Sequence, residues 1–457
     1  MKKRKCAIFV LALIFIFTSC TPANNNEIKE QIVSKSDDDM LQSAERQLTV
    51  YCEDGIALFT NATREYEQLT DTDVNLVLFE DVTEMESRIT TESLSGGGPD
   101  VYLFNSDNSL DIQKMMKNGA FYELNKLMED EMAYGGYKEE DYYPCMIEAG
   151  RYGDRQYILP FSFGMLQFYA DSSVMNTYYP ALQDGYDMQE FLGMLKEECV
   201  RVKDTDDYTN IIWGKIWSKY FLNTLLEQSQ MEYLNYEERQ VALDEATVEE
   251  MAEFWKTWIE TQKLDEILQT YMQSNELVEH CSFYAETTSV FNTLRHNVAC
   301  YRQCGIEPYF AVLPAWGTEN TYTATICEFG AVNANTAYPE ESYQLLRSIM
   351  DYQVNYDFNK TQFNLSYNLP VQKSNLHTCL QNVVQLRGKG GFEILPLTDE
   401  YEKQLEDILA NITDAVIPNP KVGSIVNEVM QPYFMGEEEF DICYTKLENR
   451  LKLYLSE

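Results

Sequence analysis

Three residues of one short segment have the types and the spacing of metal ligands. His296, Cys300 and Cys304 recur at every fourth position, so on a helix their side chains would share one face. Imidazole and thiolate groups bind zinc, but the neighbouring sequence offers no further ligand to complete a site. We therefore predict a helix face with buried thiols, and we expect neither a metal nor another cofactor.

A glycine-rich segment, SLSGGGPDVYLFN at residues 93–105, has the composition of a phosphate-binding loop. In such a loop the glycines follow a strand and open a helix, so that free N–H groups at the helix start face the anion. Gly96, Gly97 and Gly98 instead follow a predicted helix and lead into a predicted strand. Pro99 prevents any continuation of that helix. The segment is therefore a corner of the chain and does not indicate a nucleotide enzyme.

Catalytic motifs for hydrolysis are missing from the sequence. The chain has only three histidines and lacks the His-Glu-x-x-His, Gly-x-Ser-x-Gly and phosphate-loop patterns. Paired carboxylates such as Glu53 and Asp54 could serve a glycosidase, but a chain with 74 acidic residues contains such pairs everywhere. We predict a protein that is not an enzyme, and an extracellular glycoside hydrolase remains a rival interpretation.

The elements that would position these residues alternate between strands and helices. Strands are predicted at 48–52, 74–80 and 100–105, with helices near 57–68 and 82–94 between them. This order is typical of a parallel sheet covered by helices. A chain of 457 residues is also too long for one ordinary core, so we expect two lobes.

The first residues have the pattern of an export signal. Basic residues at positions 2–5 precede an apolar run from Cys6 to Phe17, which is too short to span a membrane as a helix. The run ends in Phe-Thr-Ser-Cys, which resembles the bacterial lipobox, where cleavage precedes a cysteine that then receives lipid. We expect a signal peptide at 1–19, lipid on Cys20 and a polar, disordered tether at 20–47.

The net charge and the cysteines limit which partners and which disulfide bonds we expect. The formal charge is −39, and a surface of this sign repels polyanions, so we predict no nucleic-acid partner. Of the eleven cysteines, nine remain after Cys6 and Cys20 are set aside, with no repeated spacing. A disulfide framework is typical of much smaller secreted scaffolds, so we interpret most of these cysteines as buried thiols.

Several segments, in their order along the chain, resemble the extracellular solute-binding proteins of ABC importers, family 1, the sugar-binder-like group. They are RITTESLSGGGPDVYLFN, NGAFYELNKLMEDE, GDRQYILPFSFGMLQFYADSSVM, TVEEMAEFWKTWIE, YFAVLPAWG, GAVNANTAYPEESYQLLRSIM and YFMGEEEFDICYTKLENRLKLYLSE. The resemblance implies an α/β, two-lobed periplasmic-binding-protein-like fold, in which each lobe is a mainly parallel sheet flanked by helices and hinge crossings join the lobes.

The same resemblance implies where the lobes divide. We expect an N-terminal lobe of residues 48–160 and 315–355, and a C-terminal lobe of residues 161–314 and 356–457. Crossings are expected near 159–161, near 313–314 and around 352–359. A solute that touches both lobes would favour the closed form, which would then dock on a membrane permease.

Candidate ligand-binding residues follow from the rule that open α/β sheets bind ligands at the carboxyl ends of their strands. Two acidic or amide residues follow each of the first and third strands, and ICEFGAVN places two candidates just before a predicted strand. Tryptophans after the return crossing and in NIIWGKIWSKYF could stack on sugar rings, with core packing as the alternative. The candidates are Glu53, Asp54, Asn105, Asp107, Trp213, Trp217, Trp316, Glu328 and Phe329. For Trp255 and Trp258 we predict core packing.

These observations together favour a solute-binding protein. We expect a monomer, lipid-anchored on the extracytoplasmic face of the cell membrane, that binds a carbohydrate, in particular an oligosaccharide, and delivers it to ABC permease subunits. The alternatives are the same fold binding a peptide, a polyamine or another cation, and a surface sensor that does not transport. The identity, length and linkage of the solute stay open.

Overall fold

The computed structural model describes residues 47–106, 108–133, 136–183, 185–203, 210–213, 221–261, 281–286, 297–299, 301–302, 304–352, 368–381, 386–387, 393–394 and 398–457. The predicted signal peptide, Cys20 and the tether up to residue 46 lie outside these ranges, as do Asp107, Trp217, His296 and Cys300. Within the described ranges, no helix combines the length and the apolar character needed to cross a membrane.

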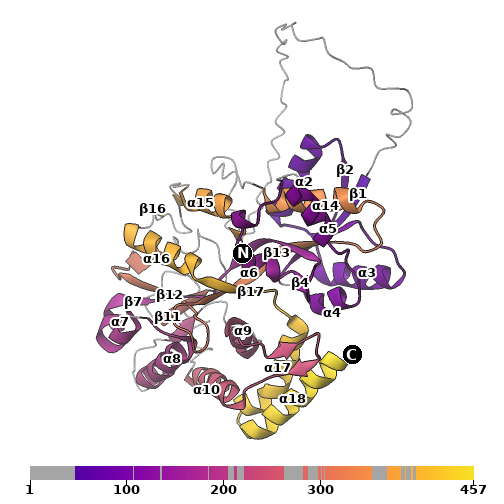
Figure 1. Ribbon diagram of the computed structural model, residues 1–457. Helices are drawn as coiled ribbons and strands as arrows, with labels where there is room; N and C mark the ends of the chain where they lie inside the picture. The colour runs from indigo at the N-terminus through magenta and orange to yellow at the C-terminus, as the bar shows by residue number, and fades with distance from the viewer. Residues whose placement is uncertain are drawn as a thin grey trace, which may run out of the picture. The chain divides into compact units, whose positions relative to one another are not determined.

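Within the residues that the structure describes, the larger sheet has seven strands, of which β1, β2, β13 and β17 are labelled in Figure 1. In order across the sheet they are β14 (Leu369–Pro370), β6 (Ile158–Gly164), β13 (Tyr322–Val332), β3 (Val101–Asn105), β1 (Gln47–Glu53) and β2 (Asp73–Phe79), with β17 (Ile412–Val416) also paired to β13. The strands β2, β1 and β3 are parallel, as the strand–helix–strand order predicts. The strand β13 is antiparallel to both β3 and β6, so the sheet as a whole is mixed.

Two helices connect the parallel strands. Between β1 and β2, α2 (Ala57–Leu69) buries Phe59, Ala62 and Tyr66 at helical spacing. Between β2 and β3, α3 (Val82–Leu94) begins where the Asp81 side chain accepts a hydrogen bond of 2.8 Å from the backbone N–H of Thr83. The prediction of strands joined by helical crossovers is therefore confirmed for this part of the chain.

The glycine-rich corner ends α3 and turns the chain into β3. The backbone N–H of Gly97 donates to the carbonyl of Glu92 at 2.9 Å, and Gly96 has a left-handed φ of 73°. A Cβ at Gly98 would lie 2.8 Å from the hydroxyl of Tyr102, so only glycine fits there without displacing that ring. The prediction of a corner, in place of a phosphate loop, is confirmed.

A second sheet of four strands carries the other part of the structure. Its order is β12 (Pro308–Val312), β7 (Gln167–Asp171), β11 (Cys281–Glu286) and β8 (Asn210–Trp213). The strand β7 is antiparallel to both of its neighbours, and β11 is parallel to β8. This sheet is therefore mixed as well.

Helices cover both sheets, and short elements complete the fold. The long helices of the second part are α8 (Met188–Lys203), α10 (Glu245–Thr261), α17 (Pro420–Phe434) and α18 (Phe440–Ser456). The remaining helices are α4 (Ile112–Lys117), α5 (Asn125–Ala133), α6 (Pro144–Glu148), α7 (Ser172–Tyr178), α9 (Phe221–Gln228), α14 (Pro339–Met350), α15 (Lys373–Gln381) and α16 (Asp399–Ala410), with 3-10 turns at Glu139–Asp141 and Pro180–Gln183. Among the described residues, two-stranded antiparallel sheets pair β4 (Arg151–Tyr152) with β5 (Arg155–Gln156), β9 (Leu234–Asn235) with β10 (Gln240–Val241), and β15 (Leu386–Arg387) with β16 (Glu393–Ile394).

The buried side chains divide into two hydrophobic cores. The first surrounds the seven-stranded sheet and the second lies under α8, α9, α10, α17 and α18. Leu405 and Ile408 of α16 and Ile412 of β17 belong to the first core, although the sequence-based boundaries assign them to the C-terminal lobe. The lobe boundaries as such stay a prediction. Trp255 and Trp258 stack at 4.4 Å in the second core, so the prediction of core packing for both is confirmed.

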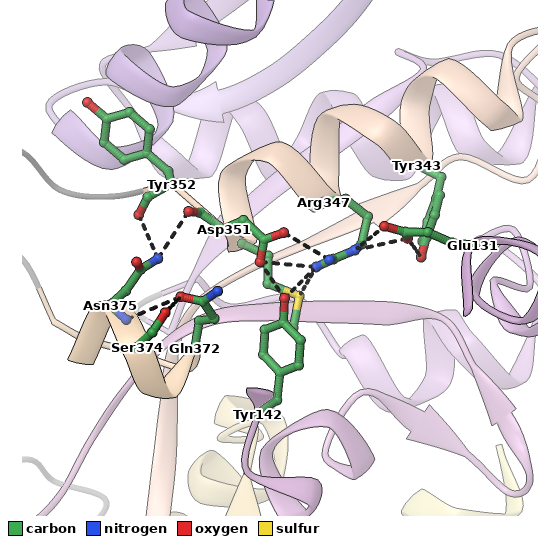
Figure 2. A network of polar contacts seen from close by, with 10 residues as sticks. Glu131, Tyr142, Tyr343, Arg347, Asp351, Tyr352, Gln372, Ser374 and Asn375 are labelled. Atoms are coloured by element: carbon green, nitrogen blue, oxygen red, sulfur yellow. Dashed lines mark hydrogen bonds and ion pairs between the residues drawn. The ribbon is translucent and has the colours of Figure 1, made fainter. Parts of the chain in front are cut away.

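The buried side chain of Arg347 contacts residues from several parts of the first core (Figure 2). Arg347 of α14 is only 5% exposed and pairs with Glu131 of α5 at 3.1 Å and with Asp351 at 2.9 Å. It also donates to the hydroxyl of Tyr142 at 3.0 Å. Asn375 of α15 donates to the backbone carbonyl of Asp351 at 3.0 Å, so the network extends to a third helix. A charge taken out of water is costly unless it is paired, and these partners offset that cost.

Candidate functional site

Two predicted site residues meet where β1 and β3 end. Glu53 is the last residue of β1 and Asn105 is the last residue of β3, and these strands are parallel neighbours. The side-chain amide of Asn105 donates a hydrogen bond to the carboxylate of Glu53. Glu328 of β13 lies directly opposite Asn105 in the antiparallel pairing. We call Glu53, Asn105 and Glu328 the strand-end cluster.

Glu328 is held in place from two further elements. It is 7% exposed, and its backbone N–H donates to the hydroxyl of Ser162 in β6 at 3.1 Å. The side-chain amide of Asn368, just before β14, donates to the Glu328 carboxylate at 2.7 Å. An amide donor stabilises the ionised carboxylate and fixes its orientation. No local sequence pattern marks Ser162 or Asn368, because both reach Glu328 through tertiary pairing.

The loop after β3 is fixed by side chains of its own and by α3. Asn108 donates to the backbone carbonyl of Asn105 and accepts from the backbone N–H of Leu110 at 3.0 Å. Both the backbone N–H and the hydroxyl of Ser109 donate to the carboxylate of Glu86, which is 8% exposed. The chain on either side of residue 107 is thereby anchored, and the predicted site residue Asp107 itself lies outside the described residues.

Asp54 differs from its neighbour Glu53. It is exposed, and its carboxylate accepts a hydrogen bond of 2.8 Å from the backbone N–H of Gly55. Its own backbone N–H donates to the carbonyl of Phe79, at the end of β2. The side chain of Asp54 therefore stabilises the turn that leaves β1, and its role toward a ligand stays a prediction.

Phe329 points to the opposite face of β13 from Glu328, because successive strand residues alternate. It is fully buried in the first core, with its ring centroid 5.5 Å from that of Phe104. The prediction that both residues precede a strand is wrong, since β13 already begins at Tyr322. Phe329 is therefore a packing residue behind the strand-end cluster in this structure, and its side chain is covered by the core.

Two of the three candidate tryptophans, Trp213 and Trp316, are described, and they lie in the second sheet and against the second core. Trp316 is half-buried against that core, and its backbone N–H donates to the carbonyl of Ser229 at 3.1 Å. Trp213 is the last residue of β8 and pairs with Tyr284 of β11. Trp217 lies outside the described residues. Their stacking on a sugar stays a prediction.

Among the described cysteines, Cys52, Cys199 and Cys443 are buried, whereas Cys145, Cys304 and Cys327 are partly exposed. Cys52 and Cys443 are buried, free cysteines, and burial raises the pKa of the Cys52 thiol to about 12. A protonated thiol is a poor nucleophile and a poor metal ligand. Among the residues described here, no group of histidine, cysteine and acidic side chains is placed to hold a metal ion.

Comparison with known proteins gives matches of fold. No protein-family model matches the sequence, and the search of curated proteins also found no match. An ABC substrate-binding protein from Listeria monocytogenes in complex with cycloalternan superposes with a TM-score of 0.58 at 10% identity, covering 90% of this chain and 99% of that chain. The extracellular solute-binding protein family 1 from Alicyclobacillus acidocaldarius superposes with a TM-score of 0.54 at 13% identity, covering 90% of this chain and 98% of that chain.

A third solved structure extends the same result. The maltose-binding periplasmic protein MalE from Listeria monocytogenes, in complex with maltose, has a TM-score of 0.56 at 14% identity, covering 90% of this chain and 99% of that chain. Agreement over nearly the whole length of each protein covers both sheets described above. The resemblance seen in the sequence is therefore confirmed at the level of fold: this chain has the two-lobed α/β fold of the periplasmic and extracellular solute-binding proteins.

Proposed function

We propose that this protein is an extracellular solute-binding protein of an ABC importer and that it binds a carbohydrate, in particular an oligosaccharide. The observation that carries this proposal is the strand-end cluster, which lies at the carboxyl ends of β1 and β3 in a fold shared with sugar-binding proteins. Carboxylate and carboxamide groups side by side supply both acceptors and donors. A sugar hydroxyl needs both, because it donates one hydrogen bond and accepts others.

The cluster is suited to binding because its geometry is already fixed. Glu53 is oriented by Asn105, and Glu328 is oriented by Asn368 at 2.7 Å. Side chains that are held in place before the solute arrives lose less conformational entropy on binding. Hydrogen bonds to ionised carboxylates are also stronger than those between neutral groups. A hydroxyl-rich solute would therefore gain most from Glu53 and Glu328.

The rest of the mechanism follows from two lobes that close on one solute. In this proposal Asp54, Asp107 and the strand-end cluster bind from the N-terminal lobe, and Trp213, Trp217 and Trp316 supply stacking surfaces. The closed protein, attached to the cell membrane through lipid on Cys20, then delivers the solute to the permease. No covalent chemistry is performed on the solute.

A cationic solute is the second candidate, and one observation favours it. Glu53 and Glu328 flank Asn105 at the end of the same sheet, and the chain carries a formal charge of −39. Two neighbouring carboxylates would bind an ammonium group as readily as a hydroxyl. A non-transporting sensor would use the same site, and only its partner would differ.

The test is a glycan array followed by titration calorimetry on the mature chain, with spermidine and short peptides as competing solutes. The proposal predicts saturable binding of an oligosaccharide with one site per chain, and weaker binding in Glu53→Gln. Binding of spermidine with no response to any glycan would establish the cationic alternative. Release of reducing ends from an array glycan would contradict the non-enzymatic part of the proposal. Incorporation of labelled fatty acid in cells, lost in Cys20→Ala, tests the lipid anchor.

A further inference from the structure

A polar cavity lies between the two hydrophobic cores. It has a volume of about 390 Å³. One side is formed by Gln113 of α4, by Glu148, Ala149 and Arg151, and by the end of β17. The other side is formed by the last turn of α9 and the chain through β9. None of the residues of the strand-end cluster lines it. Its volume falls at the lower end of the range seen for small-molecule sites, about 300–1,000 Å³.

Two carboxyl groups of this cavity are held by neutral donors. Glu227, in the last turn of α9, accepts from the side-chain amide of Asn223 at 2.8 Å and from the backbone N–H of Asn419 at 3.0 Å. Asp414 of β17 accepts from the backbone N–H of Ala415 at 2.9 Å. Burial raises the pKa of Glu227 to about 7 and also raises that of Asp414. Both groups therefore lack the stabilisation that a nearby cation would give them.

The charges around the cavity have one dominant sign. The lining residues include four carboxyl groups and one guanidinium group. That guanidinium, of Arg151, is already 3.9 Å from the Glu148 carboxylate. The titratable and charged groups that line the cavity together with Glu227 are Tyr233, Tyr236, Glu232, Asp414, Glu148 and Arg151. Behind the lining, the side-chain amide of Asn419 donates to Asp111 and to the hydroxyl of Tyr454.

Aromatic side chains complete the lining. Tyr233 and Tyr236 both border the cavity. Their hydroxyls are already engaged, since Tyr233 donates to Asn223 at 3.3 Å and Tyr236 accepts from the Asn419 amide at 3.0 Å. Their contribution to an occupant is therefore mainly the ring, and the electron-rich face of a phenol ring attracts cations. Carboxylates beside aromatic rings, in a space much larger than a single ion, suit an organic ammonium group with a carbon chain.

We propose that this cavity is a second ligand site that binds a small organic cation, a diamine or a similar amine, with Glu227 and Asp414 as its carboxylate partners. This site is separate from the strand-end cluster and does not depend on which solute that cluster binds. Hydrogen bonds from the amine would replace water around the two carboxyls, and the rings and amides would enclose its carbon chain.

The experiment is titration calorimetry of the mature chain with putrescine at about pH 8 and physiological salt. The control compound is 1,4-butanediol, which has the same carbon chain and no charge. We expect one putrescine per chain and no binding of the diol. Glu227→Gln should weaken the binding of putrescine at least tenfold, because glutamine keeps the acceptor for Asn223 and Asn419 but lacks the charge. Asp414→Asn should act in the same direction.

Two further comparisons make the outcome decisive. Glu406→Gln should leave putrescine binding unchanged, since Glu406 is exposed on α16 and does not line the cavity. Lowering the pH from about 8 to about 6 should weaken binding in the wild-type chain, because protonation of Glu227 removes the negative charge. Circular dichroism and melting temperatures confirm that each variant is folded. The proposal is overturned if putrescine does not bind, if it binds equally to all variants, or if Glu53→Gln rather than Glu227→Gln and Asp414→Asn abolishes binding.

Discussion

Glu328 of β13 lies directly opposite Asn105 of β3, although the two residues are far apart along the chain. Asn105 in turn donates a hydrogen bond to Glu53 at the end of β1. Strand register alone therefore assembles the cluster. A shift of one residue in β13 would bring Phe329 to this face and move Glu328 into the core, so the packing of Phe329 helps to determine the register.

Replacing Asn105 with alanine should weaken binding of the identified solute by about ten- to a hundredfold. The change removes one donor and leaves the Glu53 carboxylate without the group that orients it. Titration calorimetry measures the effect. Asn75→Ala is the matched control, because Asn75 is exposed on β2 of the same sheet. Equal affinities in the wild type and Asn105→Ala would remove the cluster from the binding site.

Replacing Arg347 with methionine should lower the free energy of unfolding by about 2–4 kcal/mol. The methionine fills much of the same space but leaves Glu131, Asp351 and the hydroxyl of Tyr142 without their shared donor. Urea denaturation followed by circular dichroism measures the loss. Arg347→Lys keeps the charge but not the planar guanidinium group, so its free energy of unfolding should fall less than that of Arg347→Met. A loss below about 0.5 kcal/mol in Arg347→Met would show that the network adds little stability.

Replacing Gly330 with alanine should destabilise the protein by about 1–3 kcal/mol. A Cβ at this position would lie 2.5 Å from Leu346 Cδ2 and 2.7 Å from Phe161 Cζ, inside the first core. Thermal denaturation gives the comparison. Gly193→Ala is the control: Gly193 lies in α8 with no heavy atom within 4 Å of an added Cβ, and alanine favours the helix. The prediction fails if both variants change the melting temperature in the same direction.

The pKa of Glu227 predicts how stability depends on pH. It is raised from 4.5 to about 7 in the folded chain by burial, so the folded state binds more protons than the unfolded state between these values. The stability linked to this group is therefore full below about pH 4.5 and is lost as the pH rises through about 7. Glu227→Gln should remove that loss and be more stable than the wild type at pH 8, by about 1–3 kcal/mol.

Urea denaturation of both proteins at several pH values checks this prediction. The difference between them should be small near pH 5 and should grow up to about pH 8. A constant difference over this range would mean that Glu227 titrates at the same pH in the folded and the unfolded chain.

The sequence predicted the parts of the fold and site that local patterns determine. The strands β1 and β3 and the helices between them follow from hydrophobic periodicity, and the carboxyl-end rule then selects Glu53 and Asn105. The error at Phe329 came from placing the start of the strand too late, which hid the alternation between Glu328 and Phe329. Asn368, Ser162 and Glu86 were missed because each reaches the site from another element, and no local spacing marks such contacts.

Local sequence patterns also did not indicate which charged side chains are buried. Arg347 lies on α14, and nothing near it in sequence indicates that Glu131 and Tyr142 supply its partners. The cavity beside Glu227 likewise combines residues from both cores. Such features depend on how elements pack, and they emerge only in three dimensions.

The most direct measurement of the central claim is a crystal structure of the mature chain with the oligosaccharide selected by the glycan array. We predict that sugar hydroxyls lie within hydrogen-bonding distance of the Glu53 and Glu328 carboxylates and of the Asn105 amide. A sugar bound elsewhere on the chain, with these three side chains facing only water or one another, would contradict the account.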